Sequence, residues 1–169
     1  MRRHFRSFTA RHEPGGQFVS HLKSGAGAVL GIGAVGGLAT LTGLPLLIAP
    51  LGATVVLLFG HPASPLAQPI NIFGGYLLAT ILGVAAALAF PGLWWVAAVA
   101  VGAAIAGMLM LRITHPPAGA IPLVALASPL QSTSLFITVF VSCVSLVGLA
   151  LLHHRLPPRI QYPRPLPEA

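Results

Sequence analysis

The sequence predicts an all-α membrane protein, and three observations support this fold class. Between Ser24 and His154 the only Asp, Glu, Lys or Arg is Arg112. Apolar residues make up 56% of the 169 residues and charged residues 7%, whereas soluble proteins contain about 25% charged residues. Four apolar stretches also have the length of about 20 residues that a helix needs to cross a bilayer. A bilayer explains the exclusion of charge, because one charged residue at a helix centre costs about 2.5–3.5 kcal/mol.

The four long stretches are the predicted full transmembrane helices. They lie at Ser24–Leu44, Ile70–Phe90, Leu93–Arg112 and Thr133–His153. The first contains two pairs of glycines at a four-residue spacing, Gly27/Gly31 and Gly33/Gly37, and this spacing allows helix backbones to approach closely. We interpret these pairs as packing within one protomer, with a homodimer interface as the alternative.

Two further apolar stretches, Leu51–Gly60 and Ala118–Ala127, are too short to cross the membrane as helices. Each contains ten residues, which give about 15 Å of α-helix. Pro45 and Pro50 precede the first stretch, and Pro116 and Pro117 precede the second. Since proline prevents a helix from continuing out of the preceding residues, we predict two half-helices that begin at breaks inside the membrane.

The two short stretches also resemble each other. Residues 50–54 read Pro-Leu-Gly-Ala-Thr and residues 117–121 read Pro-Ala-Gly-Ala-Ile. Ser-Pro-Leu follows both, at 64–66 and at 128–130. Each short stretch lies between two long ones, so we predict an internal repeat with halves at about 24–90 and 91–154.

The short stretches either cross the membrane together with the extended segments before them or dip in and return. Six crossings would place Arg112 on the same side as the basic tails, 1–23 and the Pro-rich 155–169, and four would place it on the opposite side. The positive-inside rule favours six. Three crossings per half would invert the second half relative to the first, as in transporters whose broken helices form a midplane site. We expect a bacterial inner-membrane protein with one domain, 24–154, and both termini in the cytoplasm.

The starts of the half-helices are the candidate substrate site. The first N–H groups of a helix have no intrahelical partner and carry partial positive charge, and Gly and Ala leave them accessible to an ion. The alternative is that water or neighbouring side chains satisfy these groups and that the glycines only allow packing. The candidate residues are Gly52, Ala53, Thr54, Gly119, Ala120 and Ile121.

Thr114 and His115 adjoin the second break and complete the predicted substrate site. His115 can hydrogen-bond an anion, relay a proton or latch the loop, because imidazole changes charge near neutral pH. Equally, it can be a neutral histidine that bonds a backbone carbonyl freed by Pro116 and Pro117.

Four further residues are candidates for an entrance or gate, namely His61, Gln68, Asn71 and Arg112. Each has a simpler interpretation. His61 is favoured as an interfacial cap, Gln68 and Asn71 can satisfy the unwound backbone, and Arg112 is favoured to snorkel to lipid phosphates.

The composition argues against several other functions. The two acidic residues, Glu13 and Glu168, both lie in the tails, so no acid/base pair is available for an enzyme. No Cys/His cluster has metal-ligand spacing, and no glycine-rich phosphate loop with its lysine is present. The basic residues responsible for the net charge of +7 lie almost entirely in the tails, where they suit a lipid surface better than a nucleic acid. We expect no enzyme activity, cofactor, metal or nucleic-acid partner.

A set of ordered motifs is similar to the HPP family of integral membrane proteins, named for a His-Pro-Pro motif. The motifs are Leu57-Leu58-Phe59-Gly60, Ser64-Pro65-Leu66-Ala67-Gln68-Pro69, Asn71, Gly74-Gly75 and Thr114-His115-Pro116-Pro117-Ala118-Gly119-Ala120. The resemblance covers about residues 24–153 and implies a compact membrane domain that is usually described with four spans. It also implies a link to nitrite, because chloroplast members of the family are associated with nitrite transport.

These observations predict a transporter or channel for a small monovalent inorganic anion such as nitrite, bound at the half-helix starts. The main alternative is a non-transporting membrane scaffold or sensor that works with a partner protein. A transporter for a small neutral or cationic solute is a third possibility.

Overall fold

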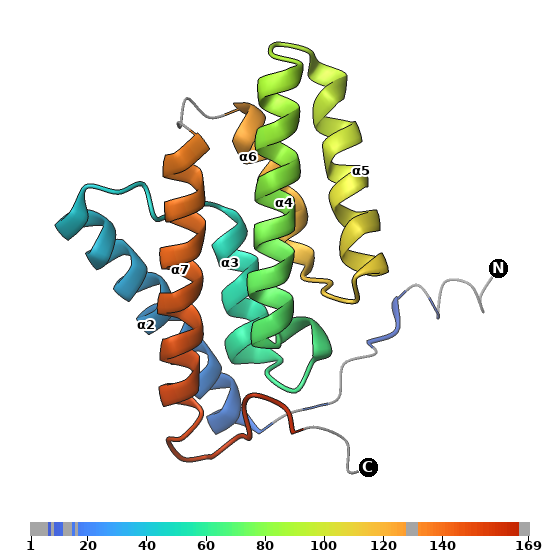
Figure 1. Cartoon of the computed structure of the whole chain (residues 1–169). Helices are drawn as coiled ribbons and strands as arrows, with labels where there is room; N and C mark the ends of the chain where they lie inside the picture. The colour runs from blue at the N-terminus through green and yellow to red at the C-terminus, as the bar shows by residue number, and fades with distance from the viewer. Residues whose placement is uncertain (1–6, 8, 12–14, 16, 128–131, 166–169) are drawn as a thin grey trace.

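The computed structural model describes residues 7, 9–11, 15, 17–127 and 132–165, and the regular structure in this part is helical throughout (Figure 1). Glu13, Glu168 and the second Ser-Pro-Leu segment, 128–130, lie outside the described residues. The all-helical class predicted from the sequence is therefore confirmed for the described chain.

Three described helices are long and apolar enough to cross a membrane: α2 (Phe18–Thr42), α4 (Pro69–Ala89) and α7 (Ser132–His153). The fourth predicted span is shorter than expected. Helix α5 (Trp94–Met110) has 17 residues, about 26 Å at 1.5 Å per residue. It ends in a turn in which Arg112 has a φ of 58°, a left-handed conformation that an α-helix cannot continue through.

Helix α2 begins earlier than predicted, at Phe18, so the last part of the predicted N-terminal tail is helical. It ends at Gly43, whose φ of 69° is left-handed and whose N–H donates to the Ala39 carbonyl. This glycine cap stops the helix and starts the irregular segment 43–48.

Both predicted half-helices are present. Helix α3 (Pro50–Val55) continues into a π-helical turn, η1 (Val56–Gly60), and the 3-10 turn η3 (Pro116–Ala120) leads into α6 (Ile121–Ala127). A second 3-10 turn, η2 (Pro65–Ala67), precedes α4. In Figure 1, α3 runs back against the direction of α2, and α6 runs back against the direction of α5. This alternation is what six crossings require, and the crossing number and the inverted repeat stay predictions.

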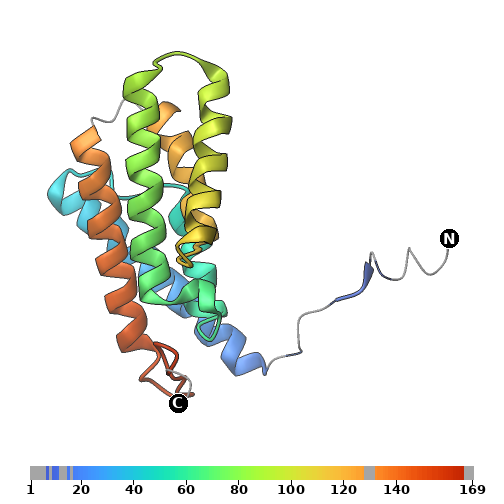
Figure 2. The same cartoon turned by 45° about the vertical axis from the view of Figure 1, so that its right-hand side comes forward.

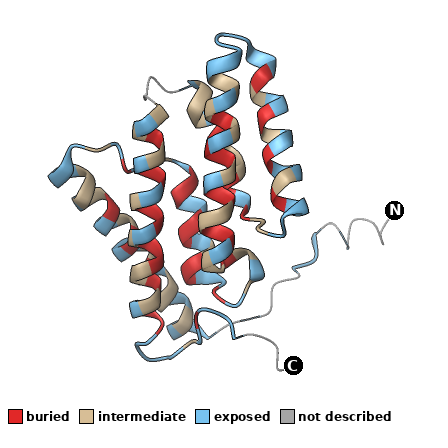
Figure 3. Ribbon diagram, in the orientation of Figure 1, coloured by how far each residue is buried: buried red, intermediate tan, exposed pale blue. Residues whose placement is uncertain are grey.

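Helix α4 lies at the centre of the bundle and packs against α5, α6 and α7, while α2 packs against α7 and η1 (Figures 1 and 2). Buried residues follow the inward faces, and the outward faces are exposed (Figure 3). These exposed faces are strongly apolar, with Leu41, Trp94 and Met110 all more than 80% exposed. Apolar surface on this scale suits lipid rather than water.

The two glycine pairs of α2 differ in their surroundings. A Cβ on Gly27 would lie 2.9 Å from His153 Nε2 and would overlap the Phe59 ring, and one on Gly31 would meet Phe59 and Leu146. A Cβ on Gly33 or Gly37 would meet nothing within 4 Å. The first pair therefore packs within the protomer, and the second leaves the homodimer interpretation open.

We expect Gly27→Ala to lower the apparent melting temperature in detergent by about 4 °C or more, because overpacking a core costs about 1–3 kcal/mol. Gly33→Ala on the same helix is the matched control, and it should leave the temperature unchanged or raise it. Equal melting temperatures for the two variants would contradict this packing.

Candidate functional site

Three buried polar side chains meet where the two breaks come together. Thr54 comes from α3, Tyr76 from α4 and His115 from the start of the second break. Thr54 Oγ1 lies 2.8 Å from the Tyr76 hydroxyl and 3.0 Å from His115 Nε2. His115 Nδ1 lies 2.8 Å from the Leu66 carbonyl oxygen. None of the three side chains has exposed surface, so they form one buried polar cluster.

Elementary hydrogen-bond chemistry fixes the direction of each bond. The Leu66 carbonyl can only accept, so His115 Nδ1 carries the proton, and in a neutral ring Nε2 is then an acceptor. Thr54 must therefore donate to Nε2, and its oxygen accepts from the Tyr76 hydroxyl. The resulting order is Tyr76 to Thr54 to His115 to Leu66, and it leaves Thr54 no second proton for the Pro50 carbonyl at 3.3 Å.

Helix α4 places the second break against this cluster. Asn71 Nδ2 donates to the Thr114 carbonyl over 3.0 Å. One turn later, a Cβ on Gly75 would lie 2.9 Å from His115 Cβ and 3.1 Å from the Ile113 oxygen. Only glycine lets the loop approach α4 this closely, and this approach brings the imidazole to Thr54.

The prediction that the Gly52 amide is free is wrong. Leu51 N–H donates to Ile48 O over 3.0 Å, and Gly52 N–H donates to Ala49 O over 3.1 Å. The reason is that Ala49 already has helical backbone angles, φ −52° and ψ −39°, so the carbonyls before the proline complete the first turn. In the second break, the amides of Ala118 and Ile121 are likewise paired, with His115 O and Ala118 O.

The half-helices instead border an apolar groove of about 740 Å³. Two of the predicted substrate residues, Ala53 and Ala120, line it, one from each short helix. Thr54 and His115 are buried beside the groove rather than on its wall. The lining residues are Ala49, Pro50, Ala53, Val56, Leu57, Pro116, Pro117, Ala120, Leu123 and Val124.

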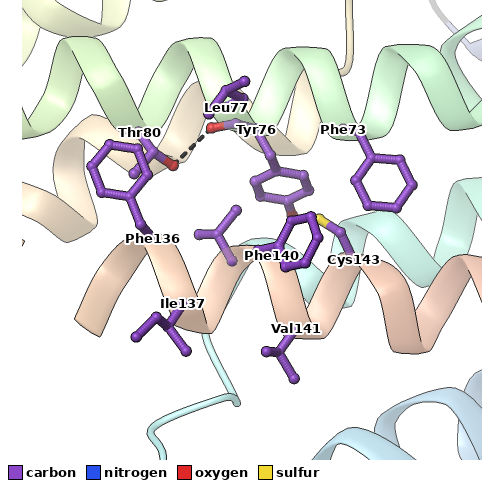
Figure 4. Close-up of a pocket in the computed structure, with 10 residues that line it drawn as sticks. Phe73, Tyr76, Leu77, Thr80, Phe136, Ile137, Phe140, Val141 and Cys143 are labelled. Atoms are coloured by element: carbon purple, nitrogen blue, oxygen red, sulfur yellow. Dashed lines mark hydrogen bonds between the residues drawn. The ribbon is translucent and has the colours of Figure 1, made fainter. Parts of the chain in front are cut away.

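A second cavity of about 360 Å³ lies between α4 and α7 (Figure 4). Tyr76 and Cys143 line it. Four other lining residues are aromatic or carry a hydroxyl group, among them Phe73 and Thr80. Thr80 Oγ1 donates to the Tyr76 carbonyl over 2.7 Å. Tyr76 thus connects the polar cluster with a mostly apolar cavity, and no motif in the sequence identifies it as a site residue.

The four predicted entrance residues do not gather at one place in the described structure. His61 and Arg112 are exposed at separate turns. Gln68 donates from Nε2 to the carbonyls of Pro62 and Ser64 and accepts at Oε1 from the Arg164 N–H. Asn71 bonds the second break as described above. Gln68 and Asn71 therefore bond unwound backbone.

Among the described residues, no group of three or more His, Cys, Asp or Glu side chains is placed to hold a metal ion. The polar groups at the breaks are the hydroxyls of Thr54 and Tyr76, the imidazole of His115 and the amide of Asn71.

The helices and the buried cluster define a polytopic membrane protein with polar groups at paired helix breaks. A family model for the HPP transmembrane region matches residues 13–163. The chain belongs to the HPP transmembrane family.

Two curated relatives from Dictyostelium discoideum are both described as transmembrane proteins. One is 36% identical over 103 residues, which cover 59% of this chain and 33% of the relative. The other is 33% identical over 113 residues, which cover 64% of this chain and 40% of the relative. The chain thus matches well under half the length of either relative. No solved structure matches the chain.

Proposed function

We propose that this membrane protein is a transporter or channel for a small monovalent inorganic anion of the nitrite type. The observation that supports this most strongly is the 3.0 Å contact between Thr54 and His115, because it joins the two broken segments through polar groups. An ionisable side chain such as His115 is costly inside a membrane domain and is a candidate for a solute pathway. The resemblance to the HPP family, whose chloroplast members are associated with nitrite transport, favours the same class of solute.

The chemistry of the cluster suits an anion better than a cation. The described residues include no Asp or Glu that could attract a cation or repel an anion. When the bonds of the cluster rearrange, the Thr54 and Tyr76 hydroxyls and a protonated imidazole supply donors to a bound anion. We propose that a small ion reaches these donors from the groove that lies beside them. Thr54 and His115, both predicted substrate residues, would then bind the ion in place of the Gly52 amide.

Purified protein in liposomes should therefore carry nitrite faster than protein-free vesicles do, measured with an internal nitrite assay. Potassium and glycerol fluxes should equal those of empty vesicles. Nitrite flux equal to the vesicle background, together with flux of nitrate, formate and halides at background, would contradict anion transport.

A non-transporting scaffold or sensor is the second candidate, and one observation favours it. The described hydrogen bonds satisfy the cluster and the amides of Leu51 and Gly52 internally, so the resting structure needs no solute. This candidate predicts no flux and co-purification with a partner protein. We further propose that the protein lies in a bacterial inner membrane with both termini in the cytoplasm.

A further inference from the structure

The segment that follows α7 folds back beneath the bundle as a strap, defined here as residues 154–164 (Figures 1 and 2). The Tyr162 hydroxyl donates to the buried Ala67 carbonyl over 2.9 Å, and the Arg164 N–H donates to Gln68 Oε1 over 2.8 Å. Burial raises the pKa of Tyr162 above its usual value, so its phenol keeps the proton that it donates. The far end of the strap is therefore held in place.

The near end of the strap is fixed as well. Lys23 Nζ donates to the carbonyls of Leu156 and Pro158 over 2.7 and 2.6 Å. The Ile160 N–H donates to the His154 carbonyl over 3.1 Å, which closes the turn. Because both ends are tied, the strap keeps a defined shape rather than acting as a loose basic tail.

Residues of the strap line an open surface pocket of about 530 Å³, a volume in the range of small-molecule sites. Arg155 and Arg159 contribute two exposed guanidinium groups to it. Neither forms an ion pair within the described residues, which contain no Asp or Glu. Its lining residues are His154, Arg155, Arg159, Ile160, Gln161 and Tyr162.

The buried side chain of His154, which also lines the pocket, is a second observation that is independent of the two arginines. Its side chain is 2% exposed, its Nε2 lies 2.8 Å from the Leu58 carbonyl oxygen, and its Nδ1 is buried without a hydrogen-bond partner. Since the carbonyl can only accept, Nε2 carries a proton. In the neutral ring Nδ1 then has an unused lone pair, and in the charged ring it has an unused N–H. Burial lowers the pKa of His154, the bond to Leu58 opposes this, and the Lys23 ammonium adds to the lowering. A negative charge in the pocket would favour the charged ring and leave Nδ1–H a donor in need of an acceptor.

We propose that this pocket binds a phosphate group, either the headgroup of an anionic lipid or a free phosphate. Arginine presents a planar fork of donors that matches phosphate oxygens. The pocket lies at the end of α7, beside the start of α2 and Lys23, where a helix leaves the membrane and lipid phosphates are found. Phosphate binding there would hold the strap against η2 and α4. This proposal does not depend on which solute the protein carries.

Native mass spectrometry of the full chain tests the lipid source. Protein would be released from nanodiscs that contain equal amounts of phosphatidylglycerol and phosphatidylcholine. We expect retained phosphatidylglycerol to exceed phosphatidylcholine at least fivefold in the unaltered protein and this preference to fall to about one in the R155Q/R159Q variant. Arg11→Gln, an exposed arginine outside the strap, is the matched control and should keep the preference.

A thermal-shift titration of delipidated protein in detergent with inorganic phosphate, at constant ionic strength, tests the free source. Stabilisation by phosphate, but not by a chloride salt at the same ionic strength, would assign the site to free phosphate. This stabilisation should be absent in R155Q/R159Q and present in Arg11→Gln. Lipid preference alone would assign it to the headgroup. The proposal is overturned if neither arm shows a strap-dependent effect, or if Arg11→Gln reduces both as much as R155Q/R159Q does. His154→Gln, which keeps a donor for Leu58, should weaken whichever effect is seen.

Discussion

Replacement of His115 by Asn is expected to reduce nitrite flux in proteoliposomes at least tenfold. The Asn amide nitrogen can take the place of Nδ1 and keep the bond to the Leu66 carbonyl, whose length is now 2.8 Å. The shorter side chain removes Nε2 and with it the 3.0 Å contact to Thr54. The variant therefore separates the two roles of the histidine, because it keeps the loop anchored and disconnects the two breaks.

The matched control is His21→Asn, which alters an exposed histidine on α2. It should leave nitrite flux unchanged. Melting temperatures in detergent show whether His115→Asn still folds, since a buried group left without a partner costs about 1–3 kcal/mol. Full flux in a folded His115→Asn protein would show that the contact with Thr54 is not needed for transport.

Removal of the hydroxyl of Thr54 is expected to destabilise the protein more than removal of the hydroxyl of Tyr76. Thr54→Val leaves two buried groups unsatisfied, the donor of Tyr76 and the acceptor Nε2 of His115. Tyr76→Phe leaves only one acceptor position of Thr54 empty, because Thr54 still donates to His115. With about 1–3 kcal/mol for each unsatisfied buried group, we expect Thr54→Val to cost about twice as much.

Unfolding in detergent of the two single variants and the double variant measures this difference as a double-mutant cycle. The double variant should cost less than the sum of the singles, because Tyr76→Phe removes the donor that Thr54→Val leaves unpaired. Thr40→Val, at an exposed threonine on α2 that bonds its own helix, should have a small effect. A larger cost for Tyr76→Phe than for Thr54→Val would contradict the order of donors in the cluster.

The sequence was a good guide to the membrane elements because their signals are local. Apolar length located α2, α4 and α7, and the prolines at 50, 116 and 117 located the starts of both short segments. The two errors in helix length have different causes. The left-handed turn at Arg112 ends α5 early, and no local pattern separates Phe18 from the basic tail before it.

The site was less predictable because its contacts join distant positions. Thr54 and His115 were both candidates, but nothing in the sequence shows that residues 61 positions apart share a hydrogen bond. Tyr76 was missed because a tyrosine in an apolar helix is also an ordinary packing residue. The free amide expected at Gly52 was wrong because Ala49 has helical backbone angles and its carbonyl accepts from the Gly52 N–H. The sequence does not show these angles, since a residue before proline usually avoids the helical region. A Pro-rich basic tail gave no sign of a fixed strap.

The most direct test of anion binding between the two breaks is a crystal structure with bromide soaked in and located by its anomalous signal. We predict bromide at the junction of the two breaks, within hydrogen-bond distance of Thr54 or His115 and reached from the groove lined by Ala53 and Ala120. Bromide bound only at the basic tails, with the Thr54–His115 contact closed and the groove filled by lipid, would contradict it.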